Sequence, residues 1–177
     1  MATSDPQFEF TADKATGTLV VRREFAAGRR LVWDCHTRRE LLDRWFAPQG
    51  LTTHTSHMDF RPGGYWHYAM IAPDGQQFWN RLDYRSIDPI DGYTATDGFC
   101  DEAGLVNPAM PSSQWSVVFA DADAEANQRT LVTTEVAYAS ATDLQTAIDM
   151  GLEGGLASTM ARLDELLVAM GPGPSIA

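Results

Sequence analysis

The sequence has little cysteine, little positive charge and no long hydrophobic run. Its two cysteines, Cys35 and Cys100, are too few for a disulfide framework and predict a reducing, cytoplasmic setting. Lysine and arginine number 13 against 24 acidic residues, so the formal net charge is −11. Such a surface repels phosphate backbones and anionic headgroups, which argues against nucleic acid and membrane surfaces as partners. No apolar run approaches the roughly 20 residues that span a bilayer.

The length and composition predict one domain. The chain has 177 residues, of which 44% are hydrophobic, enough for an ordinary globular core. Residues 1–12 are polar and show no secretory signal, so we expect a flexible N-terminal segment there. Residues 171–177 are rich in glycine and proline and predict a flexible tail. The domain is therefore expected at 13–170.

Hydrophobic periodicity predicts the order of the elements. A run rich in β-formers at 18–25 predicts the first strand, and apolar residues at helical spacing predict short helices over 29–37 and 38–45. Several extended segments separated by turn signals follow between 51 and 139. From 144 to 170, apolar residues recur every three or four positions, which predicts one helix of about seven turns.

This order of elements determines the expected fold class. Strands joined mostly by short turns imply an antiparallel sheet. A curved sheet must cover one of its faces, and the long helix is the only element large enough to do so. We therefore expect an α+β helix-grip fold. It is a curved antiparallel sheet of about six or seven strands wrapped around one long C-terminal helix, with two short helices after the first strand.

Several stretches of the sequence resemble a known family. Residues 31–48, with Leu-Val-Trp-Asp and Leu-Leu-Asp-Arg-Trp-Phe-Ala-Pro, resemble its opening motif, and 58–66 (Met-Asp-Phe-Arg-Pro-Gly-Gly-Tyr-Trp) resembles its central hairpin. Residues 150–155 resemble part of its C-terminal helix. The family is the START-related, pollen-allergen-like helix-grip superfamily (SRPBCC), in the branch named after the activator of the heat-shock-protein-90 ATPase. The resemblance implies the fold but leaves function open, because this superfamily includes lipid carriers, polyketide cyclases and a co-chaperone domain.

An aromatic hairpin supplies the main candidate for a ligand site. Trp66, Tyr68 and Met70 are two residues apart on one strand, so their side chains share a face. Met58 and Phe60 join that face if a bulge shifts the strand pairing by one residue. These five side chains either line an apolar pocket under the helix or form ordinary core. The resemblance favours the pocket, because the family fold usually keeps a cavity.

The pairing of this hairpin has an alternative. We expect the bulge at Gly63-Gly64. With a symmetric turn, His57 and Asp59 would take the places of Met58 and Phe60 on the inner face. We favour the bulge because it gathers the large apolar side chains on one side.

Further candidates lie on the next strand and on the helix. Asn80 and Tyr84 share a face and would orient a ligand, although Asn80 is as well explained by a bond to the backbone. Gly151, Gly154 and Gly155 fall in the predicted helix, where each glycine costs about 1 kcal/mol relative to alanine. They either let the helix approach the sheet closely or leave room for a ligand.

No catalytic or metal signature is present. The four histidines form no His-x-x-x-His pair, and neither a Cys-x-x-Cys nor a Gly-x-Ser-x-Gly motif occurs, so we expect no metal and no cofactor. Catalytic residues stay unassigned; a carboxylate near the pocket, such as Asp59, is the candidate for acid–base chemistry. Trp33, Trp45 and Phe46 either gate the pocket or plug the core, and their helical spacing favours the plug.

The sequence thus predicts a protein that binds a small apolar or aromatic ligand, such as a lipid or polyketide, between the sheet and the long helix. The expected ligand-binding residues are Met58, Phe60, Trp66, Tyr68, Met70, Asn80, Tyr84, Gly151 and Gly155. The alternatives are an enzyme resembling polyketide cyclases or aromatases and a co-chaperone-like module that binds protein. The resemblance also admits a homodimer.

Overall fold

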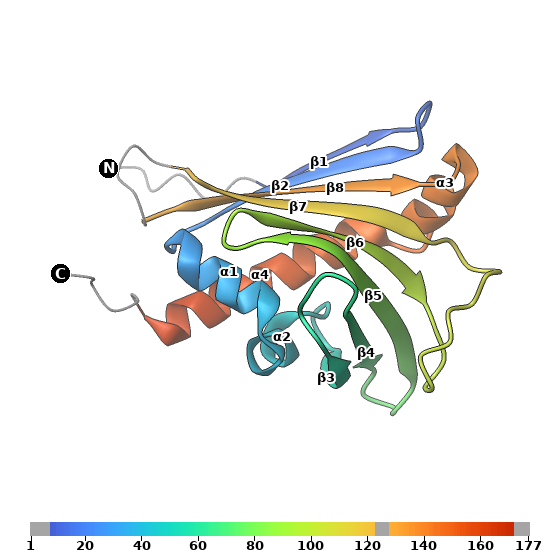
Figure 1. The fold of residues 1–177 in the computed structure, drawn as a ribbon, viewed down its shortest axis with the longest axis horizontal. Helices are drawn as coiled ribbons and strands as arrows, with labels where there is room; N and C mark the ends of the chain where they lie inside the picture. Colours follow the sequence, from blue (N-terminus) through green and yellow to red (C-terminus); the bar gives the residue numbers. More distant parts are fainter. Residues whose placement is uncertain (1–7, 123–127, 172–177) are drawn as a thin grey trace.

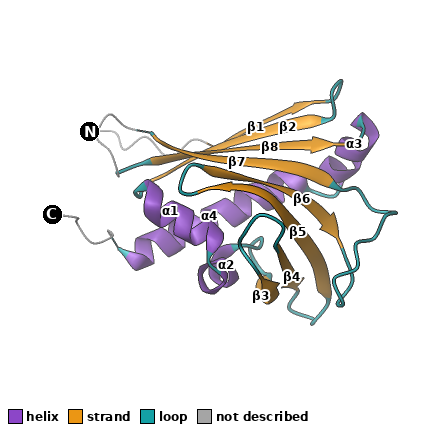
Figure 2. Cartoon of the chain, viewed as in Figure 1, coloured by secondary structure: helices purple, strands orange, loops and turns teal. Residues whose placement is uncertain are grey.

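A computed structural model describes residues 8–122 and 128–171 of the chain. These residues form eight strands and four helices, coloured along the chain in Figure 1 and by type in Figure 2. The elements are β1 (Phe8–Asp13), β2 (Thr18–Phe25), α1 (Arg29–Thr37), α2 (Arg39–Trp45), β3 (Thr52–Met58), β4 (Tyr65–Ile71), β5 (Gln77–Asp88), β6 (Gly92–Phe99), β7 (Ser113–Asp121), β8 (Thr130–Tyr138), α3 (Ala141–Asp149) and α4 (Leu152–Met170).

All eight strands belong to one antiparallel sheet. Their order is β1-β2-β8-β7-β6-β5-β4-β3, so the long connections bring β2 beside β8 while the other neighbours are consecutive in sequence. The sheet bends around α4, which crosses one of its faces (Figure 1). Side chains of α1, α2 and α4 join one buried cluster with side chains of the sheet. The α+β helix-grip fold is confirmed.

The sheet has eight strands because the segment expected to be flexible contains β1. Residues 8–13 pair with β2 from Phe8↔Arg23 to Asp13↔Thr18. Phe8 and Phe10 alternate with more polar residues and pack against a second buried cluster around Leu19. Period-two burial of aromatic residues stabilises a strand even in a polar segment. The expectations for residues 1–7 and 172–177 lie outside the described residues.

The C-terminal apolar pattern forms two helices and not one. Helix α3 ends at Asp149, and α4 begins after Gly151, whose φ of 90° lies in the left-handed region. That conformation interrupts the helix and suits glycine, which has no Cβ to clash. The apolar spacing continues across the break because both helices face the sheet, so periodicity alone gives no sign of it.

The β3–β4 hairpin contains a bulge, but not where we expected it. The register shifts between Thr55 and His57, so that Met58 pairs with Trp66 and shares its face. His57 instead pairs with His67 on the opposite face. The favoured face was therefore right and the position of the bulge was wrong. At the turn itself, a Cβ added to Gly64 would collide with the backbone of Asp59, so the glycine serves a close approach.

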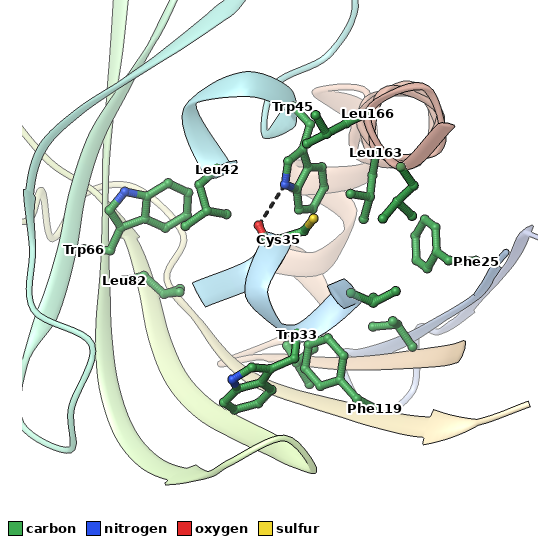
Figure 3. Close-up of a cluster of buried hydrophobic side chains, with 14 of the residues drawn as sticks. Phe25, Trp33, Cys35, Leu42, Trp45, Trp66, Leu82, Phe119, Leu163 and Leu166 are labelled. Atoms are coloured by element: carbon green, nitrogen blue, oxygen red, sulfur yellow. Dashed lines mark hydrogen bonds between the residues drawn. The ribbon is translucent and has the colours of Figure 1, made fainter. Parts of the chain in front are cut away.

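The larger core cluster holds α1, α2 and α4 against the sheet (Figure 3). Trp33 and Trp45 are buried, whereas Phe46 is half-buried. The Trp45 indole N–H donates to the carbonyl oxygen of Cys35 at 2.9 Å, which satisfies its one polar atom and ties α2 to α1. This packing fixes one end of the space enclosed between the sheet and the C-terminal helices.

Candidate functional site

A cavity of about 330 Å³ lies between the concave face of the sheet and helices α3 and α4. Its lining is mostly apolar and aromatic, with contributions from α1, α2 and the strands β4 to β8. Two lining residues, Phe78 and Met150, are 42% and 57% exposed, so they mark the side on which the cavity meets solvent. The volume is at the small end of the range of about 300–1,000 Å³ that is usual for ligand pockets.

Two rows of cross-strand neighbours form the sheet side of the cavity. Since paired residues point to the same face of a sheet, one row can be followed from strand to strand. The first row is Trp66, Leu82, Asp97, Ser113 and Tyr138 on β4 to β8. The adjacent row is Tyr68, Asn80 and Phe99 on β4 to β6. All eight side chains line the cavity.

Seven of the nine predicted ligand-binding residues line this cavity, namely Trp66, Tyr68, Met70, Asn80, Tyr84, Gly151 and Gly155. Met58 and Phe60 do not. Met58 lies on the edge strand β3, and the Phe60 ring packs edge-on against Tyr84 at 4.8 Å between ring centroids. Both are partly buried and pack against the larger core cluster. The β3–β4 hairpin therefore supplies residues both to the cavity wall and to the core. The strand face on which a residue lies did not predict which of the two it joins.

The aromatic wall is held in place by hydrogen bonds. The Trp66 indole N–H donates to Thr55 Oγ1 at 2.9 Å, and the Thr55 hydroxyl donates to Asp43 Oδ1 at 2.5 Å. Tyr68 stacks on Trp66 with ring centroids 3.8 Å apart, and Phe46 meets Trp66 edge-on at 4.9 Å. These contacts hold the two rings in fixed positions in the cavity wall.

The glycines of the helical wall leave space. A Cβ added at Gly151 or Gly154 would meet nothing within 4 Å, and one at Gly155 would make only an ordinary contact with Pro48 at 3.8 Å. The sheet is not within this reach, so close approach to it does not explain these residues. Gly151 and Gly155 line the cavity, whereas Gly154 is exposed on α4.

Known proteins share the fold described above. A family model described as "Activator of Hsp90 ATPase homolog 1-like protein" matches residues 26–168. The chain belongs to this family. Protein Ms6760 from Mycobacterium smegmatis, a crystal structure, is 30% identical with a TM-score of 0.82, over 92% of this chain and 96% of that one. The resemblance to the activator-like branch of SRPBCC is confirmed.

More distant structures of the same shape show the fold alone. A solution structure from Arthrobacter aurescens is 23% identical with a TM-score of 0.83, over 95% of both chains. The AHSA1 protein from Silicibacter pomeroyi is 17% identical with a TM-score of 0.69, over 87% of this chain and 99% of that one. No curated protein matches this member of the activator-like family.

The carboxyl group of this activator-like domain that faces the cavity is Asp97, and the sequence interpretation did not choose it. The earlier candidate, Asp59, lies outside the cavity lining and pairs with Arg61 at 2.6 Å. Tyr93, Ala95, Asp97 and Phe99 are two residues apart along β6 and therefore share a face, so an alternation argument on that strand would have found Asp97. Burial raises the pKa of Asp97 from 3.8 to about 7.

The other titratable groups of the lining are neutral near pH 7. Burial lowers the pKa of His36 to about 4, and its Nδ1–H donates to the carbonyl oxygen of Val32 at 2.8 Å. Burial raises the pKa of each lining tyrosine, that of Tyr138 to about 12. The lining holds no lysine or arginine among the residues that the structure describes. Among the described lining residues, Asp97 is thus the one whose charge changes near neutral pH.

The side-chain amide of Asn80 has a hydrogen-bond donor and a hydrogen-bond acceptor, and the two differ in their partners. Its side-chain Nδ2 donates to the carbonyl oxygen of Phe78 at 3.1 Å, which is the structural role we allowed for. Its Oδ1 accepts no hydrogen bond within residues 8–122 and 128–171, so an acceptor is left at the cavity wall.

Two further features are absent from the residues that the structure describes. It contains no group of three or more His, Cys, Asp or Glu side chains placed to hold a metal ion. None of its helices has the length and apolar character needed to cross a bilayer.

Proposed function

We propose that the protein binds a small, mainly apolar or aromatic ligand in the cavity between the sheet and helices α3 and α4. The observation that carries this proposal is the cavity itself, at about 330 Å³ with a mostly apolar and aromatic lining. The rings of Trp66 and Tyr68 supply flat apolar surface, and hydrogen bonds hold the Trp66 ring in place. Ordinary core would fill such a space with side chains.

The proposed contacts follow from the lining. Trp66, Tyr68, Met70 and Tyr84 contact the apolar body of the ligand, and Asn80 offers it a hydrogen-bond acceptor. Gly151 and Gly155 leave open the volume that the ligand occupies. Catalytic residues stay unassigned.

The test uses N-phenyl-1-naphthylamine, a neutral dye whose fluorescence rises in apolar surroundings. We expect saturable binding to the wild-type protein and a dissociation constant about tenfold higher or more for Gly155→Leu, because the leucine takes up cavity volume. Gly154→Leu is the matched control, since it makes the same change one residue away on the exposed face of α4. Equal binding by all three proteins would overturn the proposal.

A protein-binding role is the second candidate, and the family description favours it. The model that matches residues 26–168 is named for an activator of the Hsp90 ATPase. Sedimentation velocity of the protein mixed with Hsp90 tests this role. A complex that forms equally well with wild-type protein and with Gly155→Leu would support it, since the cavity would then be irrelevant. Absence of a complex would rule it out for that chaperone.

Two further proposals concern setting and assembly. We propose a cytoplasmic location, which the two free cysteines Cys35 and Cys100 support. The proposal of a homodimer rests on the family resemblance, and the same sedimentation run without chaperone tests it by the mass of the sedimenting species.

A further inference from the structure

The geometry points to a ligand that carries a protonated amine beside its apolar body, with the ammonium group paired to the carboxylate of Asp97. This inference rests on the proposed function, because it names the chemical class that the same cavity takes. Three observations support it, and each concerns a different property of the lining: an unpaired carboxylate, the charges around it, and the surrounding acceptors and rings.

The first observation is the position of Asp97. It lies in the middle of the row that crosses the concave face, between Leu82 on β5 and Ser113 on β7. Its side chain forms no hydrogen bond or ion pair within the part of the chain that the structure describes. Ser113 beside it accepts a hydrogen bond from the Trp115 indole N–H at 2.8 Å. A half-buried carboxyl group is therefore left facing the cavity without a protein partner, a state that costs free energy.

The second observation is the charge of the lining. The described lining contains no lysine or arginine, and its one histidine, His36, is neutral near pH 7 and donates to Val32. A fatty acid or an acyl phosphate would bring a second negative group beside Asp97 with no cation to offset it. An ammonium group would supply the missing opposite charge and up to three hydrogen-bond donors.

The third observation is the nature of the other groups around the carboxyl. Asn80 leaves an oxygen acceptor at the wall, and the rings of Tyr68, Tyr84 and Tyr138 surround the same space. Aromatic faces attract cations, more strongly when both are away from water. The net charge of −11 adds a general attraction for cations over the whole molecule. Acceptors, rings and overall charge therefore favour the same class of ligand.

The charge of Asp97 can be changed by pH without changing the charge of the other titratable groups around it. The titratable lining residues are Tyr68 on β4, Tyr84 on β5, Tyr93 on β6, Tyr138 on β8 and His36 on α1. Cys100, which follows β6, is outside the lining but close enough for the charge of Asp97 to raise its pKa. Burial raises the pKa of each tyrosine and of Cys100 and lowers that of His36, so none changes charge between pH 5.5 and 8. The lining residues of α3 and α4 are not titratable.

The test compares three compounds that share one ring system and differ in one group. They are 2-naphthylmethylamine, 2-naphthalenemethanol and 2-naphthoate, titrated at pH 8 by calorimetry and by displacement of N-phenyl-1-naphthylamine. We expect the amine to bind about tenfold more tightly than the alcohol, and the naphthoate to bind most weakly. Lowering the pH to 5.5 should reduce the ratio of amine to alcohol affinity as Asp97 takes up a proton.

Two variants complete the test. Asp97→Asn should bring the amine-to-alcohol ratio close to one, and Asp88→Asn, at an exposed position on β5, should keep the wild-type ratio. Because the ratio is taken within each protein, a general change in affinity does not imitate the effect. A wild-type ratio near one, or a ratio that survives in Asp97→Asn, would overturn the inference while dye binding would leave the proposed function intact. Failure of the dye and of all three compounds to bind would instead overturn both.

Discussion

Replacing Asp97 by asparagine should stabilise the free protein, with a gain that grows as the pH rises. Asparagine has nearly the same shape as aspartate but cannot ionise. In the wild-type protein, burial makes the charged carboxylate unfavourable, and no cation of the described lining offsets it. The substitution removes that unfavourable charge and leaves the packing of the row between Leu82 and Ser113 unchanged.

The sign and size of the effect follow from the pKa. In the folded protein it lies near 7, against 3.8 for the ordinary group. Between pH 4 and 7 the folded chain therefore holds more protons than the unfolded chain, so the stability of the wild-type protein falls as the pH rises through this window and is level above it. A difference of about 3 in pKa corresponds to at most about 4 kcal/mol at pH 8. Because the carboxyl group faces the cavity and is only half-buried, we expect a gain below this upper limit. Below pH 4 the gain vanishes, because the carboxyl group is then protonated in the folded and in the unfolded chain.

Urea unfolding of the wild-type protein and of Asp97→Asn at pH 4.5, 6 and 8 measures this directly. The difference in the free energy of unfolding should increase from pH 4.5 to pH 8. Asp88→Asn, which makes the same substitution at an exposed site, should stay within about 0.5 kcal/mol of wild type at each pH. A gain that is the same at all three pH values, or a loss at pH 8, would show that Asp97 is not a destabilising buried charge.

Three further changes test the site's framework by urea unfolding. Thr55→Val removes the acceptor of the Trp66 indole N–H and should cost about 1–3 kcal/mol; a neutral result would contradict the fixed aromatic wall. Gly151→Ala should destabilise by about 1–2 kcal/mol because its φ is 90°, whereas Gly154→Ala, three residues later inside α4, should stabilise by up to about 1 kcal/mol. Arg162→Met should lower the free energy of unfolding by about 1.5–3 kcal/mol, because the Arg162 guanidinium donates to three backbone carbonyl oxygens in the segment that connects α2 to β3.

Local patterns predicted most of the fold, and tertiary context decided what they missed. Alternation placed Trp66 and Tyr68 on one inner face, and this is how both came to line the cavity. The bulge at Thr55/His57 arises from pairing with β4, which no local signal in that threonine-rich stretch specifies. The break at Gly151 was hidden because the apolar spacing is the same on both sides of it.

The site was harder to predict than the fold because it depends on which long-range pairs meet. Phe60 and Tyr84 both have large apolar rings, yet only Tyr84 reaches the cavity, because the Phe60 ring packs against it in the core. Asp97 was one of many acidic residues in an acidic chain. Its place in the cavity wall comes from its pairing with Leu82 and Ser113, and these pairs exist only in the folded sheet.

A carboxyl group at the centre of an apolar cavity does not help this protein to fold. Core packing would favour leucine at this position, and the neutral amide would remove the charge without changing the shape. The stability of the fold and the proposed recognition of an amine therefore make opposite demands on Asp97. If Asp97→Asn gains stability at pH 8 and loses its preference for the amine, the two results together assign the charge to binding. A gain in stability with no change in preference would leave the buried charge real but would remove its proposed purpose.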